Sequence, residues 1–431
     1  MHVCRAWRQT IFDSPLRLNL QIPRTFGTPV KKYLGIWPNL PIAVDYCRSH
    51  TDLRTYDEEN AIYALEYPDR VVHIGLNSYL QKLATVIQKP FPVLKSLIIF
   101  APGRFGGDPL ILPANFLGGS APRLQKIYLV GVVFPTLPNF LLSASDLVEL
   151  ILHDILPTSF IPPEAMTACL VKLPKLKNLW IEFNPTSHSD QIPLSSITRT
   201  VLPALTHFRF HGHSEYLENL MSRIVCSRLD SVILYYDDLQ LADLRVVQLS
   251  MFFYLSLGPG VFTHAQASFD IWGVSFDLYP LTACTSGDWR PVTAVISCMG
   301  IGWGASRVLL ALSIFSVLLS TAVHFRLIAD SHLSLGNVDD LEWLHLLHQF
   351  PAVRALYISR QIAELIVSAL ISFSGEMVAE ALQSLDLICL EHQPTSYIDK
   401  FISLRRLSGR PITAVSAKDE FDQTLNSYNK N

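Results

Sequence analysis

The sequence predicts an α/β fold, specifically a leucine-rich-repeat solenoid in which a curved parallel sheet carries helices on its convex side. Three observations predict it: a recurrent apolar strand motif, a proline before many copies of that motif, and helix-compatible stretches between copies. A length of 431 residues would otherwise suggest about three domains. Because stacked repeats share one continuous core, residues 21–415 are instead expected to form a single solenoid.

The strand motif consists of an apolar residue, two residues, an apolar residue, one residue and a third apolar residue. Within the first eight copies and within the last three, successive copies lie 23 to 34 residues apart, which overlaps the length of leucine-rich repeats. The eleven copies are Trp37/Leu40/Ile42, Val71/Ile74/Leu76, Leu94/Leu97/Ile99, Leu124/Ile127/Leu129, Leu147/Leu150/Leu152, Leu176/Leu179/Ile181, Leu205/Phe208/Phe210, Leu229/Val232/Leu234, Ala322/Phe325/Leu327, Val353/Leu356/Ile358 and Leu382/Leu385/Leu387.

Proline marks the corner at which the chain enters five of these strands. Each of these prolines precedes the first apolar anchor by two residues, at Pro92, Pro122, Pro174, Pro203 and Pro351. Proline ends a preceding helix and cannot donate a hydrogen bond within a sheet, so it is suited to this position.

Helices are expected between the strands. In the stretch that begins at Glu215, the residues Leu217, Leu220, Met221 and Ile224 share one face at helical spacing. The stretches with helical character are Met1–Asp13, Ala61–Tyr67, Leu80–Lys89, Glu164–Leu173, Glu215–Ile224, Leu341–Phe350, Gln361–Phe373 and Tyr397–Leu407.

Residues 240–320 interrupt the repeat pattern. Strands are expected at Phe269–Phe276 and Val292–Cys298, but neither stretch carries a clear set of anchors. The length of the gap allows two further degenerate repeats.

Composition excludes several classes of protein. Hydrophobic residues make up 49% of the chain and charged residues 16%, which excludes a disordered chain. A net charge of −3 gives no basic footprint for nucleic acid. The seven cysteines have no CxxC spacing and the first twenty residues do not read as a signal peptide, so a cytoplasmic or nuclear protein with reduced thiols is expected.

One apolar segment, residues 308–323, has two interpretations. It contains sixteen residues without charge, whereas a membrane-spanning helix needs about 20. Extension back to Ile301 reaches that length but includes Arg307, which is costly inside a bilayer. A buried helix of the solenoid is favoured, and a membrane anchor at residues 301–323 is the alternative.

No catalytic motif is found, so the protein is predicted not to be an enzyme and to need no cofactor or metal. The glycine-dense segment Gly300–Gly304 lacks the spacing of a dinucleotide-binding loop. His207 and His211 alternate along a strand, which would allow a metal pair, but no carboxylate or cysteine partner is evident. Solvent-exposed histidines on the concave face are the favoured interpretation.

The residues between the anchors should face the concave side and bind a protein partner. Tyrosine, tryptophan and arginine dominate the energetics of protein interfaces. The predicted partner-binding residues are Tyr128, Trp180, His207, Arg209, Tyr235 and Tyr357.

The sequence resembles the basidiomycete family of F-box proteins with irregular leucine-rich repeats. The segment from Val3 to Arg8, followed by Ser14-Pro15, is similar to the last helix of an F-box. Further similar segments are 28–30, 37–38, 116–124, 163–170, 201–205, 214–217, 342–347 and 406–412.

The resemblance implies the substrate-recognition subunit of an SCF-type ubiquitin ligase. Residues 1–20 would be a remnant of the F-box, with Val3, Cys4, Trp7 and Arg8 contacting the ligase adaptor subunit, and residues 416–431 a flexible tail. The first F-box helices are not present before Met1, so a truncated product without ligase function is the alternative. The repeats would hold an unidentified target protein.

Overall fold

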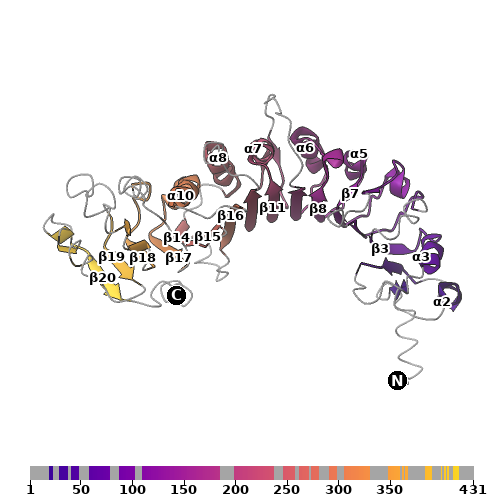
Figure 1. Cartoon of the computed structure of the whole chain (residues 1–431), viewed down its shortest axis with the longest axis horizontal. Helices are drawn as coiled ribbons and strands as arrows, with labels where there is room; N and C mark the ends of the chain where they lie inside the picture. Colours follow the sequence, from indigo (N-terminus) through magenta and orange to yellow (C-terminus); the bar gives the residue numbers. More distant parts are fainter. Residues whose placement is uncertain are drawn as a thin grey trace, which may run out of the picture. The chain divides into compact units, whose positions relative to one another are not determined.

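The structure is a computed structural model of the 431-residue chain (Figure 1). It forms two compact units: unit 1 contains residues 1–193 and 200–205, and unit 2 contains residues 194–199 and 206–431. The residues that the structure describes are 19–22, 29–36, 40–47, 58–77, 87–101, 109–184, 199–236, 246–257, 262–270, 273–280, 291–298, 305–330, 348–359, 362–363, 365–366, 384–390, 399, 402–403, 405–406 and 411–416.

Unit 1 contains a parallel sheet in which spatial order follows chain order. Its strands are β1 (Leu20–Gln21), β2 (Ile42–Asp45), β3 (Val71–Asn77), β4 (Ser96–Phe100), β6 (Lys126–Val130), β8 (Glu149–Ile155) and β9 (Asn178–Phe183). A second, short parallel pair joins β5 (Leu110–Ile111) to β7 (Val132–Val133), and β10 spans Thr200–Val201. A strand followed by a parallel neighbour requires a crossover, and the helices of this unit provide it.

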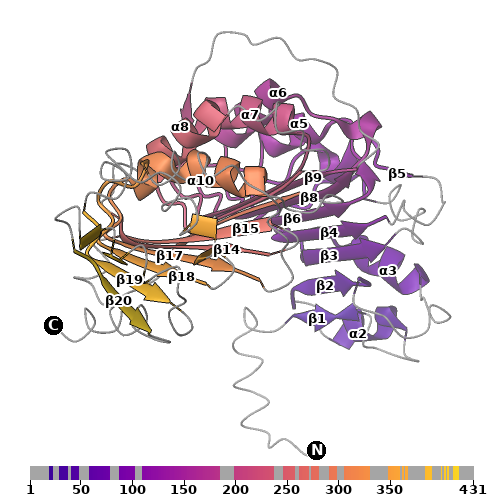
Figure 2. The ribbon, with the colours of Figure 1, turned by 60° about the vertical axis from the view of Figure 1, so that its left-hand side comes forward.

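Helices and helical turns connect the strands of unit 1. They are α2 (Val30–Ile36), α3 (Glu58–Leu65), η6 (Phe116–Gly119), α5 (Leu137–Leu141), η7 (Pro157–Ser159) and α6 (Pro163–Val171). The labelled helices lie along one side of the strands (Figure 2). The other side of the sheet, which we call the open face, carries the side chains that alternate with the buried anchors.

Unit 2 contains a mostly parallel sheet with the order β11-β13-β16-β15-β14-β17-β18-β19-β20. Its strands are β11 (His207–Gly212), β13 (Ser231–Tyr236), β14 (Phe262–Phe269), β15 (Gly273–Pro280), β16 (Val292–Cys298), β17 (His324–Ala329), β18 (Ala355–Ile358), β19 (Leu387–Leu390) and β20 (Thr413–Ser416). The other elements are α7 (Ser214–Arg223), β12 (Ile224–Val225), α8 (Val246–Leu257) and α10 (Ala305–Leu319).

The predicted leucine-rich-repeat architecture is confirmed by burial of the anchors. All three anchors of the copies that begin at Leu94, Leu124, Leu147, Leu176 and Val353 are buried. They lie at equivalent register positions, since Ile127 of β6 is paired with Leu97 of β4. Each repeat therefore adds one layer to an apolar core between the sheet and the helices.

The predicted proline corners are turns in the structure. The amides of Leu94, Leu124, Leu176 and Val353 donate to the carbonyl three residues earlier, at 3.1–3.3 Å. A proline occupies the second position of each of these turns, where its fixed φ is favoured. The turn thus places the first anchor at the start of the strand.

The gap in the repeat pattern contains an antiparallel insertion rather than two degenerate repeats. β15 is antiparallel to both β14 and β16, and β16 lies between β13 and β15. The strand expected at Phe269–Phe276 is wrong because β14 ends at Phe269 and β15 begins at Gly273, whose amide donates to Asp270 Oδ1 at 2.7 Å. The strand expected at Val292–Cys298 is confirmed as β16.

Two repeats are shifted relative to the predicted anchors. In β19, Ile388 is buried and is paired with Leu356, so the frame begins at Leu385 rather than Leu382. In β2, Val44 is paired with the anchor Ile74, so it takes the role expected of Leu40. Both segments contain overlapping apolar frames, and the pairing of neighbouring strands selects one of them.

Among the expected helices, α3, α6 and α7 confirm those that begin at Ala61, Glu164 and Glu215 within a few residues. Helical backbone is also present at 362–363, 365–366, 399, 402–403 and 405–406. The expected helix Met1–Asp13 lies outside the described residues, as do residues 80–86 of Leu80–Lys89 and 341–347 of Leu341–Phe350. The described remainders, 87–89 and 348–350, are not helical.

The apolar segment forms α10, which packs in the core of unit 2. The Phe315 ring lies 4.6 Å from that of Phe253 and 4.1 Å from that of Phe276. Within the described residues, no helix has both the length and the apolar character needed to cross a bilayer. In the structure, α10 is therefore a buried helix of the core, as favoured from the sequence.

Gly131, directly after β6, has a φ of 61° and lies against the carbonyl of Ala101. Replacement by alanine is expected to lower the free energy of unfolding of unit 1 by at least about 1 kcal/mol, because the added Cβ would collide with that carbonyl. Urea denaturation would measure the loss. Gly119→Ala is the matched control, since Gly119 has a φ of 75° with open space around its Cβ position. Equal effects of the two substitutions would contradict the steric explanation.

Candidate protein-binding face

The open face of unit 1 brings the predicted residues into ordered rows across the strands. Tyr128 of β6 is paired with Ile151 of β8, which is paired with Trp180 of β9. The neighbouring row contains Lys126 and Glu149. The side chains alternate with buried anchors along each strand, so they lie on the face opposite the core.

Two aromatic pairs fix the orientation of the largest side chains. The Tyr128 ring meets that of Phe100 edge-on, with centroids 5.0 Å apart and an angle of 65°. The indole of Trp180 meets the His153 ring at 5.4 Å and 72°. Both Tyr128 and Trp180 are half-buried, so each still presents surface to a partner. The rings are thus held before any partner arrives.

Charged groups on this face form pairs between neighbouring strands. Lys126 Nζ lies 2.8 Å from Glu149 Oε2 at a partly exposed position. His153 Nε2 lies 3.0 Å from Glu182 Oε2, and Glu182 is only 5% exposed. The opposite charges of Lys126 and Glu149 on adjacent strands stabilise the sheet. The contact with His153 holds the Glu182 carboxylate in position. The sequence alone does not indicate which of these side chains pair.

In unit 2 we likewise call the side of the sheet opposite the buried anchors the open face. On it, Arg209 lies against Tyr235. The guanidinium carbon lies 5.0 Å from the ring centroid, within the range of a cation–π interaction. His207 is exposed, whereas His211 is buried with its ring 5.8 Å from that of Tyr235. His213 precedes α7, and within the described residues no group of three potential ligands could hold a metal.

Tyr357 differs from the other predicted binding residues in its burial. It is 6% exposed and packs with Ala355 and Cys389. Its ring also lies 6.3 Å from that of His324. The position on the open face is as expected, but little of the ring is accessible, and a role in partner binding stays a prediction.

A stacked histidine pair on the open face of unit 2 was not predicted from the sequence. The rings of His264 and His324 are 4.3 Å apart and nearly parallel, at 3°. Burial and, to a smaller extent, the neighbouring His324 together lower the pKa of His264 to about 3; burial also lowers the pKa of His324. The pair is therefore neutral in the folded protein near neutral pH. The pair could have been predicted only by recognising strand β14 and its pairing with β17, which places His264 beside His324.

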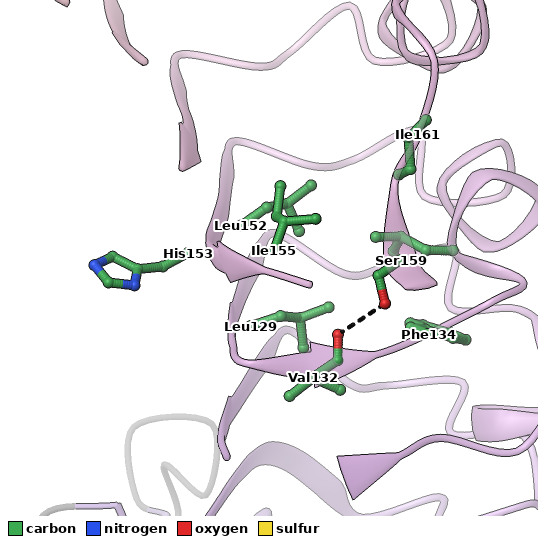
Figure 3. Close-up of a pocket in the computed structure, with 9 residues that line it drawn as sticks. Leu129, Val132, Phe134, Leu152, His153, Ile155, Ser159 and Ile161 are labelled. Carbon is green, nitrogen blue, oxygen red and sulfur yellow. Dashed lines mark hydrogen bonds between the residues drawn. The ribbon is translucent and has the colours of Figure 1, made fainter. Parts of the chain in front are cut away.

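An apolar pocket lies at the carboxyl-terminal ends of β6 and β8 in unit 1 (Figure 3). The space inside it is about 310 Å³, part of which is open solvent. The Ser159 hydroxyl donates to the Val132 carbonyl at 3.3 Å, and the His153 ring points away from the pocket. The lining therefore offers apolar contact rather than acid–base chemistry. The other lining residues are Leu129, Phe134, Leu137, Leu152, Ile155 and Ile161.

The buried thiols are suited to a structural role. Burial raises the pKa of Cys169 to about 11 and that of Cys226 to about 12. A thiol is nucleophilic as its thiolate, so these two groups are poor nucleophiles near neutral pH. In the described part of the chain, none of Cys47, Cys169, Cys226 and Cys389 forms a disulfide.

The predicted adaptor-binding residues Val3, Cys4, Trp7 and Arg8 lie outside the described residues.

Comparison with known proteins gave no match to a family model and none to a curated protein. Among solved structures, the leucine-rich repeat-containing protein LegL7 from Legionella pneumophila is similar. The match covers 92% of this chain and 99% of LegL7, with 14% identity and a TM-score of 0.27.

Proposed function

We propose that this chain is a non-enzymatic repeat protein that binds a protein target through the open face of unit 1. The observation that carries the proposal is the pair of half-buried rings, Tyr128 and Trp180, each held edge-on by a neighbouring ring. The rings lie on β6 and β9 with only β8 between them, so one target segment can contact both.

Prior orientation of the rings favours binding. Large aromatic side chains supply much of the binding energy of protein interfaces. When neighbouring groups already restrict their rotamers, less conformational entropy is lost on association. Phe100 and His153 provide that restriction here, and the parallel strands hold their backbones in register.

The paired charges give the face selectivity rather than affinity. Lys126 and Glu149 are partly exposed, and exposed ion pairs contribute little net energy. They do disfavour a target that places a positive charge beside Lys126 or a negative charge beside Glu149. A target segment with an apolar side chain between the two rings, and polar groups beside Lys126 and Glu149, would be complementary.

The finer proposal concerns the biological context. Resemblance to F-box proteins supports a role as the substrate-recognition subunit of an SCF-type ubiquitin ligase. In that role Val3, Cys4, Trp7 and Arg8 would contact the ligase adaptor subunit, while the repeats hold the target. The test is calorimetric titration of the full chain with the purified adaptor subunit. Absence of binding heat, together with a normally folded chain, would overturn this finer proposal and leave target binding intact.

Target binding is tested with the double variant Tyr128→Ala/Trp180→Ala. Proteins captured by the immobilised wild-type chain are expected to lose at least ~10-fold in enrichment on the variant, because two hot-spot residues are removed. Quantitative mass spectrometry measures the enrichment, and one captured protein is then titrated in purified form.

The matched control is Ile111→Ala, which removes an exposed apolar side chain elsewhere in unit 1. It should retain the captured proteins. Circular dichroism must show that both variants fold. If the double variant folds and captures the same proteins with unchanged affinity, binding by this face is excluded.

A further inference from the structure

The segments that lead into four neighbouring strands of unit 1 carry a surplus of positive charge. They are residues 88–95, 119–125, 142–148 and 171–177, which lead into β4, β6, β8 and β9. These segments contain six lysine or arginine residues and one acidic residue, Asp146, whereas the whole chain has 34 basic and 37 acidic residues. We call the edge of the sheet that they form the basic edge. Its six cations are all exposed: Lys89, Lys95, Arg123, Lys172, Lys175 and Lys177.

Neighbouring parts of unit 1 lack this surplus. The segment before β3 carries Glu66 and Asp69 beside Arg70, so acidic residues predominate there. At the opposite edge of the sheet, residues 131–136 and 154–164 follow β6 and β8 and include no Lys or Arg. The positive charge is therefore concentrated at one end of four strands.

Backbone hydrogen bonds hold these segments at a fixed spacing. The amide of Gln125 donates to the carbonyl of Lys95, that of Val148 to the carbonyl of Gln125, and that of Lys177 to the carbonyl of Val148, each at 2.8 Å. Neighbouring strands lie about 4.8 Å apart, so the backbones of Lys95 and Lys177 are separated by roughly 14 Å along the edge. The positions from which the charged side chains extend are thus set before any partner binds.

The basic edge contains one ion pair, in which Lys175 Nζ lies 2.6 Å from Asp146 Oδ1. Within the described residues, no carboxylate forms an ion pair with Lys95, Arg123 or Lys172. Lys172 directly follows α6, where a positive charge interacts favourably with the helix dipole. That explanation does not extend to Lys95 and Arg123, which directly flank the first anchors of their repeats. Their charges remain open to a partner.

Two exposed apolar side chains belong to the same edge. Leu142 is 47% exposed and Val171 is 49% exposed, and each precedes the first anchor of its repeat by five residues. They lie at the ends of α5 and α6, which are in contact because the Cys169 thiol donates to the Pro138 carbonyl at 3.5 Å. Val171 directly precedes Lys172. The basic edge therefore offers apolar and positive contacts side by side.

We infer that the basic edge binds an extended acidic segment of a partner protein, whose carboxylates meet the cations and whose apolar side chains meet Leu142 and Val171. Complementary charge selects such a partner and speeds its association. An extended chain advances about 3.3 Å per residue, so four or five residues cover the roughly 14 Å between Lys95 and Lys177. A peptide can also place an uncharged residue opposite Asp146.

Nucleic acid and anionic lipid are less suited to the basic edge. Both present continuous negative charge, which would meet the Asp146 carboxylate. Single-stranded nucleic acid is held by bases stacked on aromatic side chains, and aromatic residues are enriched where proteins meet a bilayer surface. Phe91, the one aromatic residue of the four segments, is 1% exposed. A protein partner therefore fits the composition of the edge best.

Fluorescence anisotropy of a labelled acidic peptide, titrated with the full chain, tests the inference. A probe of about ten residues, with glutamate at alternate positions and two central leucines, is long enough to span the edge. It should bind at low ionic strength, more weakly as salt is added, and at least ~10-fold more tightly than the same peptide with glutamine for glutamate. Lys95→Gln/Arg123→Gln/Lys172→Gln should weaken binding about 10-fold, the combined effect of three surface ion pairs.

Lys31→Gln/Lys32→Gln/Arg406→Gln is the matched control, because it removes three positive charges at exposed positions in α2 and in unit 2. It should bind the probe as the wild type does. Leu142→Ser/Val171→Ser should weaken binding of the leucine-containing probe, but not of a version with glycine in place of the leucines.

Several results would overturn the inference. The wild-type chain alone does so if it fails to bind the probe at low ionic strength or binds the glutamine peptide equally well. A folded Lys95→Gln/Arg123→Gln/Lys172→Gln variant with wild-type affinity excludes the basic edge as the site. Tighter binding to single-stranded DNA or to phosphatidylserine vesicles than to the probe excludes a protein partner. Tyr128 and Trp180 are unchanged in every variant, so these results are independent of the test of the open face.

Discussion

Phe315→Ala is expected to lower the free energy of unfolding of unit 2 by about 3–5 kcal/mol, the usual cost of deleting a buried aromatic ring. Phe315 is fully buried in α10, and its ring contacts those of Phe253 and Phe276. Removal of the ring leaves a cavity between α8, α10 and β15. Urea denaturation followed by circular dichroism measures the change, and hydrogen exchange locates it in α8 and α10.

Phe315→Leu is the matched control, because it keeps most of the buried volume. Volume-conserving replacements in a core usually cost less than about 1.5 kcal/mol. Val317→Ala, on the exposed side of the same helix, should change stability least. If Phe315→Ala left unfolding and hydrogen exchange unchanged, α10 could not be a core helix, and a membrane-anchored arrangement of this segment would have to be reconsidered.

Local sequence patterns were sufficient to predict the regular repeats. The anchors Leu124, Ile127 and Leu129 lie within six residues, and Pro122 fixes the turn before them. Each feature depends on residues close in the chain, so an individual repeat can be recognised without knowledge of its neighbours. Stacking of successive repeats then accounts for the burial of these anchors and for the parallel order of β4, β6 and β8.

The interruption could not be predicted, because it depends on pairing between distant strands. β16 lies beside β13, although about 60 residues separate them in the chain. An antiparallel β15 leaves no repeat-length spacing for a pattern search to detect. The anchors of β19 were mispredicted for a related reason. Both Leu382/Leu385/Leu387 and Leu385/Ile388/Leu390 fit the strand motif, and only the pairing of β19 with β18 selects the second set.

The candidate site was predictable in position but not in contacts. Alternation along a strand placed Tyr128, Trp180 and Arg209 on the open face. The contact between Trp180 and His153 depends on the register of β8 with β9, which the sequence does not specify. Burial of Tyr357 similarly depends on Cys389 in the next strand.

The histidine pair gives unit 2 an expected sensitivity to acid. His264 is 1% exposed, stacks on His324, and has its Nδ1 3.1 Å from Thr263 Oγ1. The register places Tyr279 of β15 opposite His264 and Ala355 of β18 opposite His324, while Arg326 lies in the next row. Tyr279 and Ala355 carry no carboxylate, and Asp277, in the same row as Arg326, accepts a hydrogen bond from Thr293 Oγ1 at 2.8 Å. The pair is therefore expected to resist protonation.

The direction of the effect follows from the lowered pKa values. An unfolded histidine takes up a proton near pH 6.5, whereas His264 in the folded protein does so only at about pH 3. Below pH 6.5 the unfolded state therefore binds more protons, and the stability of unit 2 falls as pH decreases toward about 3. The slope from His264 approaches about 1.4 kcal/mol per pH unit within this window.

His264→Phe keeps a ring in the stack but cannot titrate, so its stability should fall less steeply between pH 6.5 and pH 4 than that of the wild type. Urea denaturation at several pH values measures both slopes, and the comparison removes the contribution of the carboxyl groups that the two proteins share. His207→Phe, at an exposed position on β11, is the matched control and should keep the wild-type slope. Identical slopes for wild type and His264→Phe would mean that His264 is protonated in the folded protein, and the stacked neutral pair would then be wrong.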